Sequence, residues 1–97
     1  MAYLVDEMEN YHPLNLPLET RIGRGEGNHI QISHDLHVSR RHAVIIYDEE
    51  KGEFKIKDLG SKHGTYVNGE KIEGERVIKN GDHIRLGKET RLIFKVL

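Results

Sequence analysis

Apolar residues along the chain come in short groups broken by glycines, and they never recur at helical spacing over a stretch long enough for a helix. Residues 54–59 show a different pattern, because apolar and charged side chains alternate there. This alternation predicts a half-buried strand in which Phe54 and Ile56 face the core. Lys55 and Lys57 should face water. The chain is therefore expected to be all-β, with almost no helix.

The most apolar segment, residues 43–47, is nearly continuous and rich in β-branched side chains. Such a segment is typical of a strand that is covered on both faces and lies at the centre of the core. The loop that follows, residues 49–52, ends in a glycine, which suits the positive φ of a short hairpin connection. Residues 43–47 should therefore pair with residues 54–59.

Two more hairpins are expected further along the chain. Asn68 and Gly69 are a strong signal for a type I′ turn, because both central positions of that turn need a positive φ. This turn should join a strand at residues 65–67 to one at residues 70–72. A last hairpin over residues 83–96 should close the sheet.

The first part of the chain carries weaker signals. Residues 3–5 and 20–22 have the composition of strands, while Pro13 and Pro17 confine the segment between them to an edge or a loop. Short strands separated by turn residues point to a β-sandwich of mostly antiparallel strands. Residues 1–97 should form a single domain of this kind.

The composition limits the kind of partner. With 15 basic and 16 acidic residues, the net charge is −1, which lacks the positive excess that favours nucleic acid or an acidic membrane surface. Binding to an anion must therefore depend on a local group of cations. The chain has no cysteine, no secretory signal pattern after Met1 and no apolar run of membrane-spanning length. We expect a soluble cytoplasmic protein without disulfides.

Three segments place cations or hydroxyl groups in turn-rich loops beside short strands. A rigid β scaffold presents side chains to an anionic ligand in this way, because guanidinium and hydroxyl donors match the oxygens of a phosphate. The segments are Gly23-Arg24, Ser39-Arg40-Arg41-His42 and residues 60–69. They predict a protein that recognises phosphate rather than one that catalyses a reaction.

In this order the segments resemble the forkhead-associated (FHA) domain, a β-sandwich that binds phosphothreonine peptides through loops at one end. The resemblance runs from about residue 22 to the C-terminus, and the joint occurrence of its motifs is far more specific than any one of them. The matching residues are Gly23, Arg24, Ser39, His42, Gly60, Ser61, Gly64, Thr65, Asn68, Gly69, Gly81, Asp82, Ile84, Leu86 and Gly87.

The resemblance implies a role for each loop residue. Arg24 and Ser39 would donate hydrogen bonds to the phosphate, Arg40 would reach the phosphate or the peptide, and Lys62 would add a positive charge. The family commonly has an asparagine before the second glycine of its longest motif, whereas this chain has His63. His63 is expected to contact the peptide, and near a dianion its protonated form should be favoured.

A second set of residues is expected to support the loops rather than to touch the ligand. His42 should be a buried imidazole that braces two loops, and Thr65 and Asn68 should hold their turns by side-chain hydrogen bonds. The supporting residues are Gly23, His42, Gly64, Thr65, Asn68 and Gly69. Residues 67–71 and 78–82 are candidate neighbours of the peptide beyond its phosphothreonine.

Parts of the sequence are compatible with other functions. A partner-binding or self-association module that ignores phosphorylation fits the same fold, and the sequence leaves the oligomeric state open. Residues 23–28 are glycine-rich, but no Gly-Lys-Ser/Thr and no helix follow, so a nucleotide site is not expected. His34 and His37 lack an obvious third ligand for zinc, so neither metal nor cofactor is expected.

The sequence also does not predict a hydrolytic triad. Ser39, His42 and Asp35 are residue types that form one, but they lie too close together in sequence to supply an oriented base and an oxyanion hole. We therefore expect no enzyme activity, and a phosphothreonine-containing protein is the expected partner.

Overall fold

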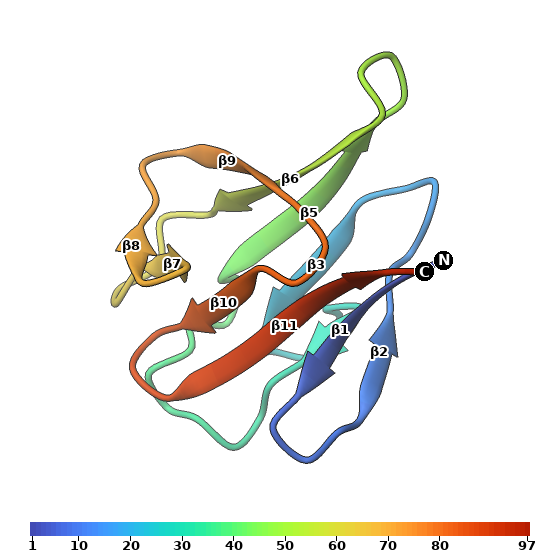
Figure 1. Ribbon diagram of the computed structural model, residues 1–97. Coiled ribbons are helices and arrows are strands. Elements are labelled where there is room, and N and C mark those ends of the chain that lie inside the picture. The colour runs from blue at the N-terminus through green and yellow to red at the C-terminus, as the bar shows by residue number, and fades with distance from the viewer.

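The computed structural model describes residues 1–97 and consists of two β-sheets packed face to face (Figure 1). One sheet contains, in order across it, β2 (Tyr11–Pro13), β1 (Ala2–Asp6), β11 (Thr90–Val96), β10 (His83–Leu86), β7 (Thr65–Val67) and β8 (Glu70–Lys71). The other contains β4 (Ile30–Gln31), β3 (Thr20–Gly23), β5 (Ala43–Asp48), β6 (Glu53–Asp58) and β9 (Glu75–Ile78). All neighbouring strands are antiparallel except β3 and β4, which are parallel.

The core lies between the two sheets, and alternate side chains of strands such as β1 and β11 contribute to it. Phe94 and Leu4 are fully buried at its centre, and the Phe54 ring packs edge-on against Phe94 at 5.1 Å between centroids. The prediction of which side chains of β6 face the core is confirmed, because Ile56 is buried and Phe54 packs against the core. The all-β sandwich expected from the sequence is the observed architecture.

The predicted pairings are also present. β5 pairs with β6 along its whole length, and the glycine that ends their connection, Gly52, has φ 63°. β7 pairs with β8 through a turn in which Asn68 has φ 50° and Gly69 has φ 86°, as a type I′ turn requires. β10 and β11 form the last hairpin, and β2 lies at a sheet edge as Pro13 requires.

Some element predictions were incomplete. β5 is covered on both faces only in its first half, because Val44 is buried whereas Ile46 is exposed to 39%. Lys55 is half-buried rather than fully solvated, since its Nζ lies 3.7 Å from an Asp48 carboxylate oxygen. The strand expected at 70–72 ends at Lys71, and the Ile72 side chain turns into the core instead.

Two short strands had no clear sequence signal. β4 has two residues and β9 lies at a sheet edge, so neither shows enough alternation to stand out from a loop. Both are fixed by pairing with neighbours from elsewhere in the chain. No helix that could cross a membrane occurs in the structure.

The connections that carry the sequence motifs gather at one end of the sandwich, on the lower left in Figure 1. Backbone hydrogen bonds join them: Leu59 N donates to His42 O at 2.9 Å, and Gly87 N donates to Gly64 O at 3.1 Å. The chain termini lie side by side away from these loops, since Met1 N donates to Leu97 O at 2.8 Å (Figure 1).

Candidate functional site

Arg24 follows directly after β3, and the β4–β5 connection holds both its main chain and its side chain. Its backbone N–H donates to Ser39 O at 2.9 Å, and its guanidinium Nε donates to Val38 O at 3.0 Å. No carboxylate lies within ion-pairing distance of the guanidinium. The side chain is therefore fixed at Nε while its Nη donors are left for a ligand.

Gly23 and its neighbours bring this loop against the next one. A side chain at Gly23 would collide with the Arg40 carbonyl oxygen, so only glycine allows the close approach. The same carbonyl accepts hydrogen bonds from Gly25 N at 3.2 Å and Asn28 Nδ2 at 2.8 Å. Arg40 thus has a fixed main chain and an exposed side chain beside Arg24.

The Ser39 hydroxyl is oriented by the third loop. Lys62 N donates to Ser39 Oγ at 3.1 Å, so the oxygen accepts one hydrogen bond and its own hydrogen stays free to be donated. Ser39 is half-buried and Lys62 is exposed. The structure therefore brings Arg24, Ser39 and the Lys62 main chain together from three separate connections.

His42 is fully buried beneath these loops. Ser39 N donates to His42 Nδ1 at 3.0 Å, and the opposite ring nitrogen, Nε2, donates to Gly64 O at 2.8 Å. This pattern of one acceptor and one donor is that of a neutral imidazole. Burial lowers the pKa of His42 and outweighs the opposing effects of the Gly64 carbonyl and the Asp58 and Asp35 charges. The ring links two of the three loops as a neutral group.

Asp58 organises the loop that carries Lys62. One carboxylate oxygen accepts from Gly60 N and Ser61 N, each at 3.0 Å. The other accepts from Ser61 Oγ at 2.6 Å and from Thr65 Oγ1 at 2.7 Å. Burial raises the pKa of Asp58, but these hydrogen bonds outweigh it and the net pKa is lowered. The sequence analysis missed Asp58, although an aspartate shortly before Gly60 and Ser61 is a turn signal.

The other supporting residues do not all lie at the same place. Gly64 has φ 88°, and its backbone N–H donates to Ser61 Oγ at 2.9 Å. Asn68 and Gly69 lie at the opposite end of β7, where the Asn68 side chain joins the turn to β10 by accepting from His83 N at 2.9 Å. These two residues shape the β7–β8 turn rather than the three loops at Arg24.

His63 packs beside a residue that the sequence analysis assigned no role in the site. Its ring meets that of His37 edge-on, with 5.1 Å between centroids. Burial lowers the pKa of His63, and positive charge on His37, Lys88 and Lys62 adds to the effect. A nearby anion would offset that charge, so the protonation of His63 depends on whether one is bound.

His37 is in turn anchored to a buried carboxylate. Its backbone N–H donates to Asp35 Oδ1 at 2.8 Å, and Asp35 Oδ2 accepts from Thr90 Oγ1 at 2.7 Å. Burial raises the pKa of Asp35, but the Thr90 and His37 hydrogen bonds outweigh it, so the pKa is lowered. The contact between the loop at 35–37 and β11 spans distant parts of the sequence, which left no local signal for it.

Residues 78–82, expected as neighbours of the peptide, lie between the β7–β8 turn, where Asp82 accepts from Asn68 Nδ2 at 3.1 Å, and the end of β11. Asn80 accepts a hydrogen bond from Val96 N at 2.8 Å, at the end of β11. Thr90, at the start of the same strand, contacts Asp35 beneath the site loops. The length of β11 therefore separates Asn80 from Thr90 and Asp35.

The alternative chemistries have little support in the geometry. Both ring nitrogens of His42 bond backbone groups and Ser39 Oγ accepts from a backbone amide, so Ser39, His42 and Asp35 do not form a triad. No three His, Cys, Asp or Glu side chains are grouped so as to hold a metal ion. His37 packs on His63, so it does not join His34 in a common site.

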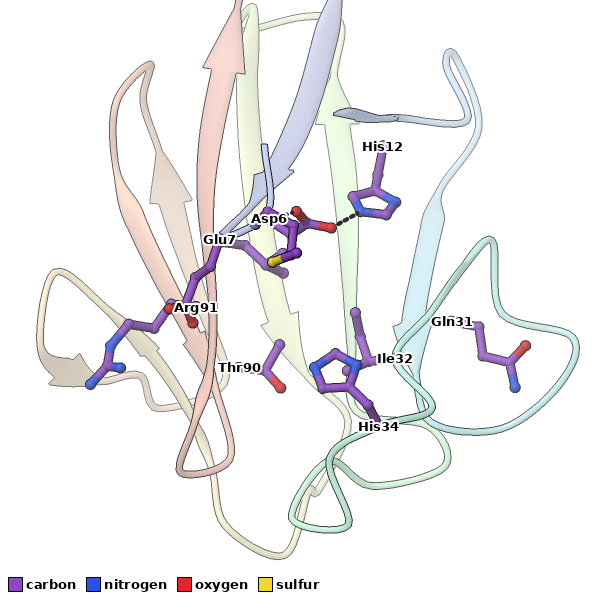
Figure 2. A pocket seen from close by; sticks show the side chains of 10 residues that line it. Asp6, Glu7, His12, Gln31, Ile32, His34, Thr90 and Arg91 are labelled. Atoms are coloured by element: carbon purple, nitrogen blue, oxygen red, sulfur yellow. Dashed lines mark hydrogen bonds and ion pairs between the residues drawn. The ribbon is translucent and has the colours of Figure 1, made fainter. Parts of the chain in front are cut away.

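His34 faces a different hollow. This cavity of about 180 Å³ lies between the β1–β2 turn and the start of β11 (Figure 2). Figure 2 shows His34 standing away from His12, which points at Asp6 with 2.9 Å between Nε2 and Oδ2. That hydrogen bond is the main reason that the pKa of Asp6 is lowered to about 2. The two histidines of this cavity therefore do not converge on one point.

Comparison with known proteins agrees with the fold and the motifs. Residues 20–87 match the FHA domain family. The glycogen accumulation regulator GarA of Mycolicibacterium smegmatis is 48% identical over 60 residues, which cover 62% of this chain and 35% of that protein. The oxoglutarate dehydrogenase inhibitor of Corynebacterium efficiens is 48% identical over 60 residues, which cover 62% of this chain and 39% of that protein. The matched segment thus spans little more than a third of these relatives.

A solved structure of high similarity is that of Mycobacterium tuberculosis EmbR in complex with a low-affinity phosphopeptide. It is 37% identical to this chain with a TM-score of 0.86, and the match covers 97% of this chain and 24% of EmbR. The relatives are named as a regulator and an inhibitor. From its match over residues 20–87 and its sandwich fold, the chain belongs to the FHA domain family.

Proposed function

We propose that this domain binds proteins phosphorylated on threonine and that Arg24, Ser39, Arg40 and Lys62 hold the phosphate. The observation that carries the proposal is the state of Ser39 Oγ, which accepts from Lys62 N and keeps its own hydrogen for a ligand. The Nη donors of Arg24 are free at the same place, because its Nε is occupied by Val38 O. Hydroxyl and guanidinium donors around one point suit a phosphate dianion.

Each group has a distinct task in this proposal. Arg24 forms charge-assisted hydrogen bonds to two phosphate oxygens, and Ser39 donates to a third. Arg40 and Lys62 add positive charge at the exposed rim, where their side chains have no carboxylate partner. His63 contacts the peptide main chain beside the phosphate.

The supporting residues set the spacing of the loops. Gly23 allows the approach to Arg40, and His42 links Ser39 to Gly64 through a neutral ring. Thr65 fixes the Asp58 carboxylate that orders the third loop. Asn68 and Gly69 hold the neighbouring turn. In this proposal these residues never touch the ligand.

The expected affinity follows from the number of charged hydrogen bonds. Each contributes about 1.5–3 kcal/mol, so three or four would supply roughly 5–10 kcal/mol. Ordering a flexible peptide offsets part of this gain, which gives a dissociation constant on the order of micromolar. An apolar niche for the threonine methyl would favour phosphothreonine over phosphoserine by about 1–3 kcal/mol.

The wider setting belongs to the same proposal. Residues 1–97 would act as one FHA unit in the cytoplasm, as the sequence pattern predicts. Similarity to a regulator and an inhibitor suggests that the protein controls its partner by docking to it. The partner is a protein that carries phosphothreonine, and the domain binds neither nucleic acid nor lipid.

A titration with one threonine peptide in phosphorylated and unphosphorylated forms tests the proposal. Isothermal calorimetry should give micromolar binding for the phosphorylated form and none that is measurable for the other. The same peptide with phosphoserine should bind about tenfold more weakly, as loss of a methyl contact implies. Equal affinities for the phosphorylated and unphosphorylated forms would instead favour a phospho-independent interaction module.

A further inference from the structure

Two open clefts lie beside the proposed phosphate site, and neither contains a hydrophobic residue. One, of about 430 Å³, is lined by Arg24, Gly25, Glu26, Gln31, Arg40 and Arg41. The other, of about 380 Å³, is lined by Arg21, Glu26, Gly27, Asn28 and Arg41. Arg41 and Glu26 line both clefts, so the two form one continuous polar surface, which we call the arginine cleft.

The arginines of this surface are not neutralised within the protein. Arg21, Arg40 and Arg41 have no carboxylate within ion-pairing distance, and their guanidinium groups donate no hydrogen bond to the chain. Glu26 is the single acidic residue of the lining, and it is exposed. The arginine cleft therefore carries an excess of positive charge although the chain as a whole has a net charge of −1.

The main chain beneath the cleft is held in place. Asn28 Nδ2 donates to Gly25 O at 2.7 Å and to Arg40 O at 2.8 Å, so one side chain fastens the two loops together. Gln31 Nε2 donates to Arg24 O at 3.1 Å on the other side. A ligand that enters the cleft has only to order arginine side chains, which reduces the entropy that its binding costs.

The cleft also adjoins the proposed phosphate site, because Arg24 and Arg40 belong to both. A peptide whose phosphothreonine sits at Arg24 and Ser39 must therefore place a neighbouring residue near Arg41. An apolar side chain would find no hydrophobic residue to pack against there. A second phosphate would find guanidinium groups with free donors, which match its oxygens in geometry and charge.

We propose that the arginine cleft binds a second phosphorylated side chain of the same ligand, so that this domain prefers doubly phosphorylated segments. This inference rests on the proposed function, because the first phosphate positions the second. Arg41 is the principal contact, since it lines both parts of the cleft and has no place in the first phosphate site. Glu26 opposes the second phosphate through its negative charge.

The test uses a set of phosphothreonine peptides in which a phosphoserine is moved through successive positions on both sides. At the matching spacing, fluorescence anisotropy should show binding about tenfold or more tighter than that of the singly phosphorylated peptide. Arg41→Gln should abolish that gain and leave binding of the singly phosphorylated peptide unchanged. Glu26→Gln should increase the gain, because it removes a repulsive charge.

Arg91→Gln is the matched control, since it removes the same charge from β11, outside the cleft. It should leave the gain intact. A gain that is equal at all spacings, or that survives Arg41→Gln, would overturn the inference while leaving the proposed function in place. Failure of every phosphorylated peptide to bind would overturn both, so the two failures can be told apart.

Discussion

At the scale of single residues, the site depends on donors that the protein has fixed but not used. The Arg24 guanidinium donates from Nε to Val38 O, and its other N–H groups donate to no group of the protein. Ser39 Oγ accepts from a backbone amide and keeps its proton. Both side chains are therefore ordered before a ligand arrives, so little conformational entropy is lost when it binds.

Replacing Arg24 separates binding from stability. Arg24→Ala should weaken phosphopeptide binding about 100-fold or more, because it removes at least two hydrogen bonds to a charged group. The folded state loses only the hydrogen bond to Val38 O, worth about 0.5–1.5 kcal/mol. Calorimetry and thermal unfolding measure the two effects, with Arg91→Ala as a control for lost charge. Strong destabilisation with intact binding would mark Arg24 as structural instead.

His63 should make binding depend on pH. Its pKa is lowered from 6.5 in the free protein by burial and by the charge of His37, Lys88 and Lys62, whereas Asp35 acts in the opposite direction. A bound phosphate raises that pKa again, so the complex holds a proton on His63 over a pH range in which the free protein has already lost it. Binding should therefore strengthen relative to His63→Asn at low pH.

Phosphothreonine itself titrates near pH 6, so the measurement is the ratio of the two proteins' affinities for one peptide. This ratio cancels the titration of the peptide. It should rise as pH is lowered from about 7.5 to about 5.5. A ratio that is constant over this range would show that His63 is not coupled to the phosphate.

At the scale of elements, a carboxylate and a histidine hold the site loops, because they give loop groups the hydrogen-bond partners that a neighbouring strand would otherwise supply. Asp58 satisfies two backbone N–H groups and two hydroxyls in the β6–β7 connection. His42 links the β4–β5 and β6–β7 connections by accepting from Ser39 N and donating to Gly64 O. Removal of either group should loosen a whole loop rather than a single contact.

Asp58→Ala tests this directly. It should destabilise the domain by about 2–4 kcal/mol through lost hydrogen bonds to a charged group, and it should weaken phosphopeptide binding although Asp58 does not reach the ligand. Because the folded pKa of Asp58 lies below 3.8, its stabilisation is complete above about pH 4 and is lost as pH falls further. Chemical unfolding at neutral and acid pH measures the effect.

The comparison variant is Asp48→Ala, which removes a carboxylate from the β5–β6 turn at the other end of the sandwich. It should cost less stability, since Asp48 accepts only from Glu50 N at 3.1 Å and Lys51 N at 3.3 Å and contacts Lys55. It should not change phosphopeptide binding. Equal losses of binding in both variants would argue against a special role of Asp58 in the loop.

The sequence was sufficient for those elements whose pattern is local. Alternation along residues 54–59 predicted β6. Asn68 with Gly69 predicted the β7–β8 turn, because an Asn-Gly pair suits two positive φ angles well. β4 and β9 were missed because pairing with distant strands defines them. Ile46 was misjudged, since its composition does not reveal that nothing covers the second half of β5.

The residues of the candidate site also fall into those that the sequence could predict and those that it could not. Arg24, Ser39 and Lys62 stand out in sequence through family motifs, whereas their convergence requires the sandwich. His37 and Asp35 could not be predicted, because their partners His63 and Thr90 come from other loops and strands. Contacts of this kind arise only when the topology is known.

At the scale of the whole molecule, a chain with almost balanced charge has a strongly basic end. Its 16 acidic residues include Asp48, Glu49 and Glu50 in the β5–β6 turn, at the other end of the sandwich from Arg24 and Arg41. The overall charge therefore contributes little attraction to a phosphorylated partner. Binding should depend on local cations that salt screens.

Raising the salt concentration should consequently weaken binding without destabilising the fold. The Debye length falls from about 10 Å at 0.1 M to about 3 Å at 1 M, so the exposed charges of Arg40 and Lys62 should lose most of their effect. Affinity should fall about tenfold across this range, while the unfolding temperature stays nearly constant. Unchanged affinity would mean that the phosphate is held by buried donors alone.

The placement of the two chain ends has a practical consequence. Met1 and Leu97 meet away from the site loops, on the right in Figure 1, and are joined by hydrogen bonds in both directions. A tag, a fluorophore or a solid support fused at either terminus would point away from the ligand. An immobilised copy would thus offer its whole recognition surface to solution, so the domain is suited to capturing phosphorylated peptides from mixtures.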